Sequence, residues 1–155
     1  MDKIIHIKPE SIEAKHRSEH PKYEFFRRNL VTDREGGQCE IAMYEIPPGK
    51  AGFPYHYHVK NEESFYILKG EGLLKTPDGE RKVVAGEFLF FPANANGAHM
   101  LTNSSQTEML VYLDFDTHND LEVAVYPDTG KIGVWGMGIN QLHQVENRVR
   151  YYDGE

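Results

Sequence analysis

The segment from Pro47 to Gly72 reads PPGKAGFPYHYHVKNEESFYILKGEG, and its residues decide the fold. Within it, His56 and His58 are separated by one residue, and Glu63 follows five positions after the second histidine. Successive side chains of a strand point to opposite faces, so both imidazoles project to the same side. A turn after His58 would return the chain antiparallel and place Glu63 beside the pair. Imidazole nitrogen and carboxylate oxygen are typical ligands of a divalent transition metal, so this segment is a candidate metal site.

The rest of the chain from Gln38 onward consists of short strand-like runs separated by turn residues at roughly ten-residue spacing, which is typical of a β-sandwich or barrel. Two turns carry strong signals, Thr-Pro-Asp-Gly at 76–79 and Pro-Asp-Thr-Gly at 127–130. Proline presets the first bend of such a turn and glycine accepts a positive φ. The expected strand runs are 39–46, 55–58, 64–69, 73–75, 81–85, 87–91, 98–103, 108–115, 121–126 and 132–135.

The N-terminal segment, residues 1–37, is expected to form an arm outside the barrel. Residues 4–7 read as a short β-like start, and the charged stretch 11–28 has weak helical character. Gly36-Gly37 marks a turn before the first barrel strand. The arm would pack on the barrel or on a second subunit.

The C-terminal segment, residues 116–155, is expected to add strands and a short helix to the barrel core at 38–115, all within one single domain. The helix is predicted from the spacing of Leu142, Val145 and Val149.

Bulk composition excludes several classes of protein. A chain of 155 residues is long enough for one domain with a sizeable core. Its net charge of −7, with no basic cluster, disfavours nucleic acid or an anionic membrane as a partner. Neither a long apolar span nor a secretory leader is found, and Cys39 is the single cysteine. These features make a cytoplasmic protein the default expectation.

Two groups of residues together resemble the cupin superfamily. Cupins carry a first motif Gly-x5-His-x-His-x3-4-Glu-x6-Gly and a second motif Gly-x5-Pro-x-Gly-x2-His-x3-Asn on neighbouring strands of a small barrel. The residues that match the first motif are His56, His58, Glu63 and Gly70. Those that match most of the second are Gly86, Pro92, His99 and Asn103. The resemblance covers roughly residues 38–115.

Two departures from the motifs concern turns. Lys50 stands where the first motif expects its opening glycine, and Asn94 replaces the second glycine of the second motif in a loop that is two residues longer. These changes affect the shape of the cavity mouth and leave the ligand assignment intact.

The resemblance implies an all-β fold, a double-stranded β-helix or jelly-roll-like barrel, with one divalent metal held by His56, His58, Glu63 and His99. Two alternatives stay open: Glu62 competes with Glu63, although only Glu63 keeps the spacing to Gly70, and an isolated histidine at 99 could be a core residue. Three imidazoles and a carboxylate suit Mn, Fe, Ni, Cu, Co or Zn better than Mg or Ca. Such a set leaves one or two coordination positions open for substrate, water or dioxygen.

The residues around this site leave the reaction open. Phe65, Ile67 and Leu101 share the ligand faces and would line an apolar cavity, with barrel core as the favoured interpretation. Only Glu45 or Glu87, if either faced inward, could serve as a general base, so the catalytic residues are not identified.

We therefore expect a metal-binding protein for a small organic molecule, with a dioxygenase-like oxidoreductase as the first hypothesis because that chemistry needs no further protein base. The alternatives are a non-catalytic module that binds a small acid or sugar-like ligand, and a non-redox isomerase. A homodimer is expected, because open barrel edges are commonly covered.

Overall fold

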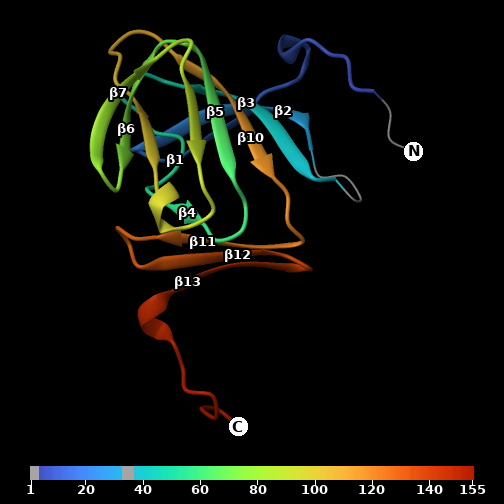
Figure 1. Ribbon diagram of the computed structural model, residues 1–155, viewed down its shortest axis with the longest axis vertical. Helices are drawn as coiled ribbons and strands as arrows, with labels where there is room; N and C mark the ends of the chain where they lie inside the picture. Colours follow the sequence, from blue (N-terminus) through green and yellow to red (C-terminus); the bar gives the residue numbers. More distant parts are fainter. Residues whose placement is uncertain (1–3, 33–36) are drawn as a thin grey trace.

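The computed structural model describes residues 4–32 and 37–155, and β-strands account for nearly all of its regular structure (Figure 1). The strands are β1 (Lys15–His20), β2 (Tyr23–Val31), β3 (Cys39–Ile46), β4 (Tyr57–His58), β5 (Glu63–Lys69), β6 (Glu71–Thr76), β7 (Gly79–Val84), β8 (Phe88–Phe91), β9 (Met100–Asn103), β10 (Leu110–Thr117), β11 (Leu121–Tyr126), β12 (Lys131–Gly136) and β13 (Ile139–Gln144). Three single-turn 3-10 helices join them, η1 (Pro9–Ser11), η2 (Ala95–Gly97) and η3 (Val145–Asn147).

The strands form three sheets. A six-stranded sheet has the order β1-β2-β3-β10-β5-β8, and a three-stranded sheet has the order β7-β6-β9. Figure 1 shows these two sheets wrapped around a common interior, with β11, β12 and β13 lying across the lower end. In this third sheet, β11 pairs with the two-residue strand β4, which carries His58. The all-β barrel expected from the sequence is confirmed.

The core lies between the six-stranded and the three-stranded sheet. Tyr112 and Ile67 are buried in the first, and Leu74 and Leu101 in the second. Phe65 also belongs to this cluster, so the interpretation of Phe65, Ile67 and Leu101 as barrel core is confirmed. Burial of these large side chains supplies most of the free energy that holds the sheets together.

Three motif residues have structural roles that explain why those residue types stand there. Gly70 and Gly86 have φ angles of 83° and 90°, in the left-handed region that favours glycine, and each turns the chain between strands. The buried amide of Asn103 donates to the carbonyl oxygens of Ile46 and Glu108, each at 2.8 Å. Because these bonds satisfy a buried polar group, Asn103 ties β9 to the end of β3.

The N-terminal segment differs from its expected conformation. Residues 4–7 form no strand, and the stretch 11–28 is not helical, because β1 and β2 form an antiparallel hairpin there. β2 then pairs with β3, which makes the hairpin part of the six-stranded sheet. The expected turn at Gly36-Gly37 has its first glycine outside the described residues.

The short C-terminal helix predicted from the sequence is wrong. Leu142 lies in β13, and only η3 at Val145–Asn147 has helical geometry. β13 pairs with β12 along its whole length, from Lys131↔Gln144 to Gly136↔Ile139. Of the three residues at helical spacing, Leu142 is therefore a strand residue, since backbone pairing with β12 outweighs the weak local preference, and Val149 lies beyond η3.

None of the helices in residues 4–32 and 37–155 combines the length and apolar character needed to cross a membrane.

The alternation along β6 can be tested with two leucines that are neighbours in the sequence. Leu74 is 4 % exposed and Leu73 is 37 % exposed. We expect Leu74→Ala to lower the free energy of unfolding by about 2–5 kcal/mol, because it leaves a cavity in the core. Leu73→Ala is the matched control and should cost less than about 1 kcal/mol. Equal losses in urea unfolding would contradict the register of β6.

Candidate metal centre

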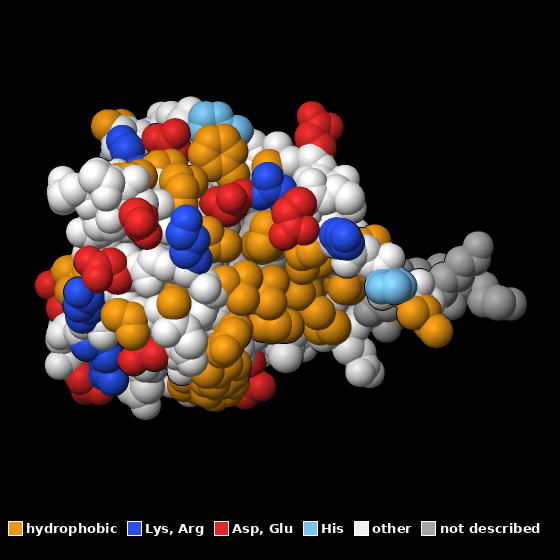
Figure 2. Space-filling view, turned by 90° about the horizontal axis from the view of Figure 1, so that it is seen from above, with side chains coloured by type: hydrophobic (Ala, Val, Ile, Leu, Met, Phe, Trp, Pro, Cys, Tyr) orange, Lys and Arg blue, Asp and Glu red, His pale blue; other side chains and the backbone are white. Residues whose placement is uncertain are grey.

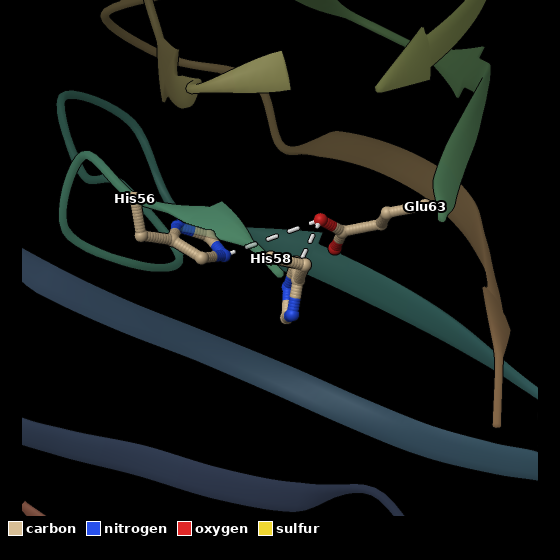
Figure 3. Close-up of side chains that lie close together, drawn as sticks. All are labelled: His56, His58 and Glu63. Atoms are coloured by element: carbon tan, nitrogen blue, oxygen red, sulfur yellow. Dashed lines mark ion pairs between the residues drawn. The ribbon is translucent and has the colours of Figure 1, made fainter. Parts of the chain in front are cut away.

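The four side chains named by the motifs lie together at the lower end of the barrel. His56 immediately precedes β4, His58 lies in β4, Glu63 begins β5 and His99 immediately precedes β9. One carboxylate oxygen, Glu63 Oε2, is 3.0 Å from His99 Nε2, 3.6 Å from His58 Nε2 and 4.0 Å from His56 Nε2. Figure 3 shows the imidazoles of His56 and His58 facing the carboxylate of Glu63. The competing carboxylate, Glu62, is on an exposed residue, whereas Glu63 is 5 % exposed.

Backbone pairing fixes the distances between these side chains. His56 and His99 form an isolated antiparallel bridge in which each residue's N–H donates to the other's carbonyl oxygen, at 3.1 and 2.8 Å. His58 is held separately, because β4 pairs with β11 and places His58 opposite Ala124. The site is thus assembled from strands far apart in the sequence, and its geometry depends on the whole barrel.

Hydrogen bonds to the backbone fix the tautomers of two histidines. His56 Nδ1 lies 2.8 Å from the carbonyl oxygen of Pro54, and His99 Nδ1 lies 2.9 Å from that of Gly97. A carbonyl oxygen only accepts, so each Nδ1 carries the proton and donates it. In the neutral ring the lone pair is then on Nε2, the atom that faces Glu63.

The carboxylate oxygen at the centre of this group has no hydrogen-bond donor. Glu63 Oε2 is buried and makes no hydrogen bond of acceptable geometry, although His99 Nε2 is 3.0 Å away. Lone pairs of imidazole nitrogens directed at a buried anionic oxygen repel it unless a cation lies between them. Ligand atoms that each lie about 2.1 Å from one transition-metal ion are about 3 to 4 Å from one another, and Glu63 Oε2 is 3.0 to 4.0 Å from an Nε2 atom of each histidine. His56, His58 and Glu63 each offer a ligand atom within 4.8 Å of the other two. The residues therefore fit a divalent metal.

The pKa values of His56 and Glu63 favour the protonation states that a metal ligand needs. Burial and the neighbouring His99 together lower the pKa of His56 to about 4, so this ring is neutral near pH 7. Burial alone would raise the pKa of Glu63, but the imidazoles of His99, His56 and His58 outweigh it and hold this pKa below its ordinary value. A neutral imidazole and an ionised carboxylate are the forms that bind a metal.

Comparisons with known proteins agree on the family. The family model described as "Cupin domain" matches residues 42–116. A provisionally named sugar phosphate isomerase from Acidithiobacillus ferrooxidans is 28 % identical, with a TM-score of 0.78 over 91 % of each chain. A sugar phosphate isomerase of the cupin superfamily from Silicibacter pomeroyi is 22 % identical, with a TM-score of 0.77 over 96 % of this chain and 98 % of that one. This chain belongs to the cupin superfamily.

Among curated proteins, an uncharacterised protein of Aquifex aeolicus is 29 % identical to this cupin over 92 residues, which cover 53 % of this chain and 74 % of the relative.

A second carboxylate lies near Nδ1 of His58, the ring nitrogen opposite the one that faces Glu63. Glu122, on β11, is buried and its Oε1 is 3.6 Å from His58 Nδ1. The same carboxylate accepts hydrogen bonds from the backbone N–H groups of Val59, Lys60 and Asn61. Burial raises the pKa of Glu122, but His58 and these N–H groups lower it by more. Glu122 thus holds both the loop after β4 and the ring of His58 in place, as outer carboxylates do for metal-ligating histidines.

Two carboxyl groups that the sequence analysis did not name lie beside Glu63, one on the buried residue Asp114 and one on the half-buried residue Asp116. Asp114 and Asp116 project from the same face of β10, and an oxygen of each lies within 4.8 Å of the other and of a Glu63 oxygen. In each aspartate, Oδ1 is buried without a hydrogen-bond partner. Burial raises the pKa of both groups, and the nearby carboxylates raise it further. A usable signal was present, because the mixed face of the run 108–115 carries Tyr112 and Asp114 opposite the apolar Val111 and Leu113, and Asp116 continues that face one residue beyond the run.

The two glutamates considered as bases from the sequence have other roles. Glu45 forms an ion pair with Arg28 on the neighbouring strand. Glu87 accepts a hydrogen bond from the backbone N–H of Val84 and so stabilises the turn after β7.

Three of the four candidate metal ligands, His56, His58 and Glu63, line a cavity whose two lobes share lining residues. The inner lobe, about 420 Å³, is lined by His56, His58, Glu63 and both aspartates of β10. The outer lobe, about 500 Å³, lies between the loop 117–120 and β12 and is lined by residues that include His118. His58, Asp116 and Trp135 line both lobes, so they mark the junction. Together the lobes are large enough for a small organic molecule.

The assignment of Glu63 can be tested against its neighbour in the sequence. We expect Glu63→Gln to reduce the metal content of the purified protein to below about a tenth of the wild-type ratio, because the anionic ligand is lost. Glu62→Gln, the matched control, should leave the metal content unchanged. Elemental analysis of protein purified without added metal is the measurement, and a loss of metal from Glu62→Gln with retention by Glu63→Gln would overturn the assignment. His99→Ala should behave as Glu63→Gln does.

Proposed function

We propose that this cupin is a metal-dependent isomerase that moves a proton between adjacent carbons of a small hydroxy-carbonyl compound. The observation that carries the proposal is the presence of Asp114 and Asp116 in the same cavity as three of the candidate ligands, His56, His58 and Glu63. Isomerisation requires an acid and a base beside the reacting carbons, and the sequence alone offered neither.

His56, His58, Glu63 and His99 would hold the metal, which is one of Mn, Fe, Ni, Cu, Co or Zn. When bound, such an ion polarises carbonyl and hydroxyl oxygens as a Lewis acid. The cation and the buried carboxyl groups would then act on neighbouring atoms of one substrate, because Asp114 and Asp116 each have an oxygen within 4.8 Å of a Glu63 oxygen.

The protein groups account for the proton transfers. A carboxylate of the pair on β10 removes the proton from the hydroxyl-bearing carbon next to the carbonyl. The electron pair of that C–H bond forms the C=C bond of an enediolate, and the π pair of the carbonyl goes to its oxygen. The carboxylic acid so formed returns the proton to the former carbonyl carbon, and the hydroxyl proton passes from its oxygen to the former carbonyl oxygen, which completes the isomerisation without net oxidation. Asp116 is the better candidate for this role, because it is part of both lobes, where a substrate would pass.

The structural relatives support this class of reaction. Both solved structures described above carry the name sugar phosphate isomerase, and the first of them is 28 % identical to this chain. The dioxygenase-like chemistry expected from the sequence was favoured because no protein base was identified, and the position of Asp114 and Asp116 removes that reason.

The reaction class can be tested by hydrogen exchange. We expect the purified protein, incubated in D2O with a panel of aldoses and ketoses, to replace the C–H hydrogen next to the carbonyl with deuterium, seen by NMR. Treatment with a chelator should abolish the exchange. Oxygen consumption without exchange would favour a dioxygenase, and metal binding with neither would favour a binding module.

The role of Asp116 can be tested in the same assay. Asp116→Asn should slow the exchange about 10²- to 10⁴-fold, because the amide cannot accept the proton, while metal content stays unchanged. Glu87→Gln removes a carboxylate outside the cavity and should have no effect. Full exchange by Asp116→Asn would contradict the assignment.

We also propose that the cupin is a homodimer that associates through the outer face of β5 and β8. Tyr66, Leu68, Phe88 and Phe90 on these strands are 40 to 62 % exposed, and β8 is the end strand of its sheet. Tyr66 lies opposite Phe88 in the strand pairing, so the aromatic side chains adjoin. Hydrophobic side chains also gather in a broad area on the face drawn in Figure 2. Exposed apolar sheet edges of this kind are usually covered by a partner, and a second copy would pair β8 with itself.

Light scattering after size exclusion tests the dimer. We expect twice the mass of one chain for the wild type, and the mass of one chain for the double variant Phe88→Asp with Phe90→Asp, because two buried charges would oppose association. Leu142→Asp, at an exposed position on β13, is the control and should stay dimeric. A wild type that remains monomeric at micromolar concentration would refute the proposal.

A further inference from the structure

The cavity that holds the candidate ligands is acidic. Its two lobes are contiguous, and the carboxyl side chains that line them are Glu40, Glu63, Asp114, Asp116, Asp120 and Glu122. Among the same lining residues, Arg27 is the single lysine or arginine. If the candidate metal ligand Glu63 and the pair Asp114 and Asp116 are left out, the three remaining carboxyl groups still outnumber the guanidinium of Arg27. They are Glu40, Asp120 and Glu122.

Arg27 is already engaged by other groups of the protein. Its Nη2 is 3.6 Å from Glu40 Oε2, and its Cζ is 5.5 Å from the centre of the Tyr44 ring. A phosphate monoester carries about 1.5 to 2 negative charges at pH 7 and needs cationic or N–H donors to replace its water. The lining of this cavity offers a phosphate no free arginine or lysine.

The outer lobe is instead suited to neutral hydroxyl groups. Its lining includes Asn61 and Asn119, whose side chains are hydrogen-bonded to each other at 2.8 Å, and the hydroxyl of Thr117. Together these amides, hydroxyls and carboxylates offer both hydrogen-bond donors and acceptors. A polyhydroxylated molecule can use both, because each of its hydroxyl groups donates and accepts hydrogen bonds.

Trp135 supplies an apolar surface at the junction of the lobes. Its ring lies so close to Gly133 that a Cβ there would overlap the ring, which shows that the indole is packed over the backbone of β12. The indole also lines both lobes. A fixed aromatic ring surrounded by carboxylates and amides suits the C–H face of a sugar ring or chain, with the polar groups on its hydroxyls.

We infer that the substrate of this cupin is an unphosphorylated sugar or related polyol, bound with its chain extending from the inner lobe past Trp135 into the outer lobe. This inference rests on the proposed isomerase function and narrows its substrate class. It also separates this protein from the relatives whose names specify sugar phosphates.

The single tryptophan of the chain provides a direct measurement, since all indole fluorescence comes from Trp135. The probes are pairs of aldo- and ketopentoses and hexoses with their terminal phosphate esters, titrated into the protein as purified with its metal. We expect a saturable change in fluorescence with at least one free sugar, and binding at least ten-fold weaker for its phosphate ester. Raising the salt concentration should reduce that difference, because the repulsion is electrostatic.

A pair of variants tests the origin of the selectivity. Asp120→Asn removes a carboxylate of the outer lobe and should bring the affinity of the phosphate ester at least two-fold closer to that of the free sugar. Asp128→Asn is the matched control, because Asp128 pairs with Lys75 outside both lobes, and it should leave the ratio unchanged.

The possible outcomes separate the two proposals. Tighter binding of a phosphate ester than of its free sugar, or no fluorescence response to any pair, would overturn the inference on substrate class. Binding of a free sugar without hydrogen exchange in D2O would support the inference and refute the isomerase. Exchange only with phosphate esters would support the isomerase and refute the inference.

Discussion

The carboxylate of Glu63 lies in the protein interior among three imidazole nitrogens, and its inner oxygen has no hydrogen bond. An isolated buried charge of this kind is costly, so the surrounding structure has to compensate for it. The groups that surround this charge come from distant parts of the chain. Backbone carbonyls before β4 and β9 accept hydrogen bonds from Nδ1 of His56 and His99, and these bonds orient the two rings toward Glu63. Glu122 of β11 supports His58 in a similar way. The barrel is thus arranged around one cluster of atoms that fits a cation.

Much of this arrangement could be predicted from the sequence, because the signals were periodic and local. The spacing of His56, His58 and Glu63 follows directly from the two-residue period of a strand and the turn after it. Glycine at 70 and 86 marked turns that need positive φ, and both glycines have it. The second group of motif residues named His99, whose Nε2 lies 3.0 Å from Glu63 Oε2, although nothing local to that histidine distinguishes it from an ordinary core residue.

Other features depend on tertiary context and were missed. All six residues of β1 are exposed, so its sequence carries no alternation that could distinguish strand from helix. Apolar residues of the C-terminal segment happen to follow helical spacing, yet Leu142, the first of them, pairs with β12 as part of a strand. Asp114 and Asp116 were overlooked because burial usually follows the apolar face of a strand, whereas β10 turns its mixed face inward. Functional sites are where such exceptions to the hydrophobic pattern are expected.

Because fold and reaction are separable, relatives with the same barrel need not share a substrate. What distinguishes members of such a family is the set of side chains that face the opening, here mostly carboxylates, amides and one indole.

The hairpin of β11 and β12 carries both Glu122 and Trp135. One structural unit therefore governs how an imidazole is oriented and what the entrance of the cavity accepts. Grafting this hairpin from a homologue would alter ligand choice and cation affinity together, so neither property can be re-engineered there independently of the other.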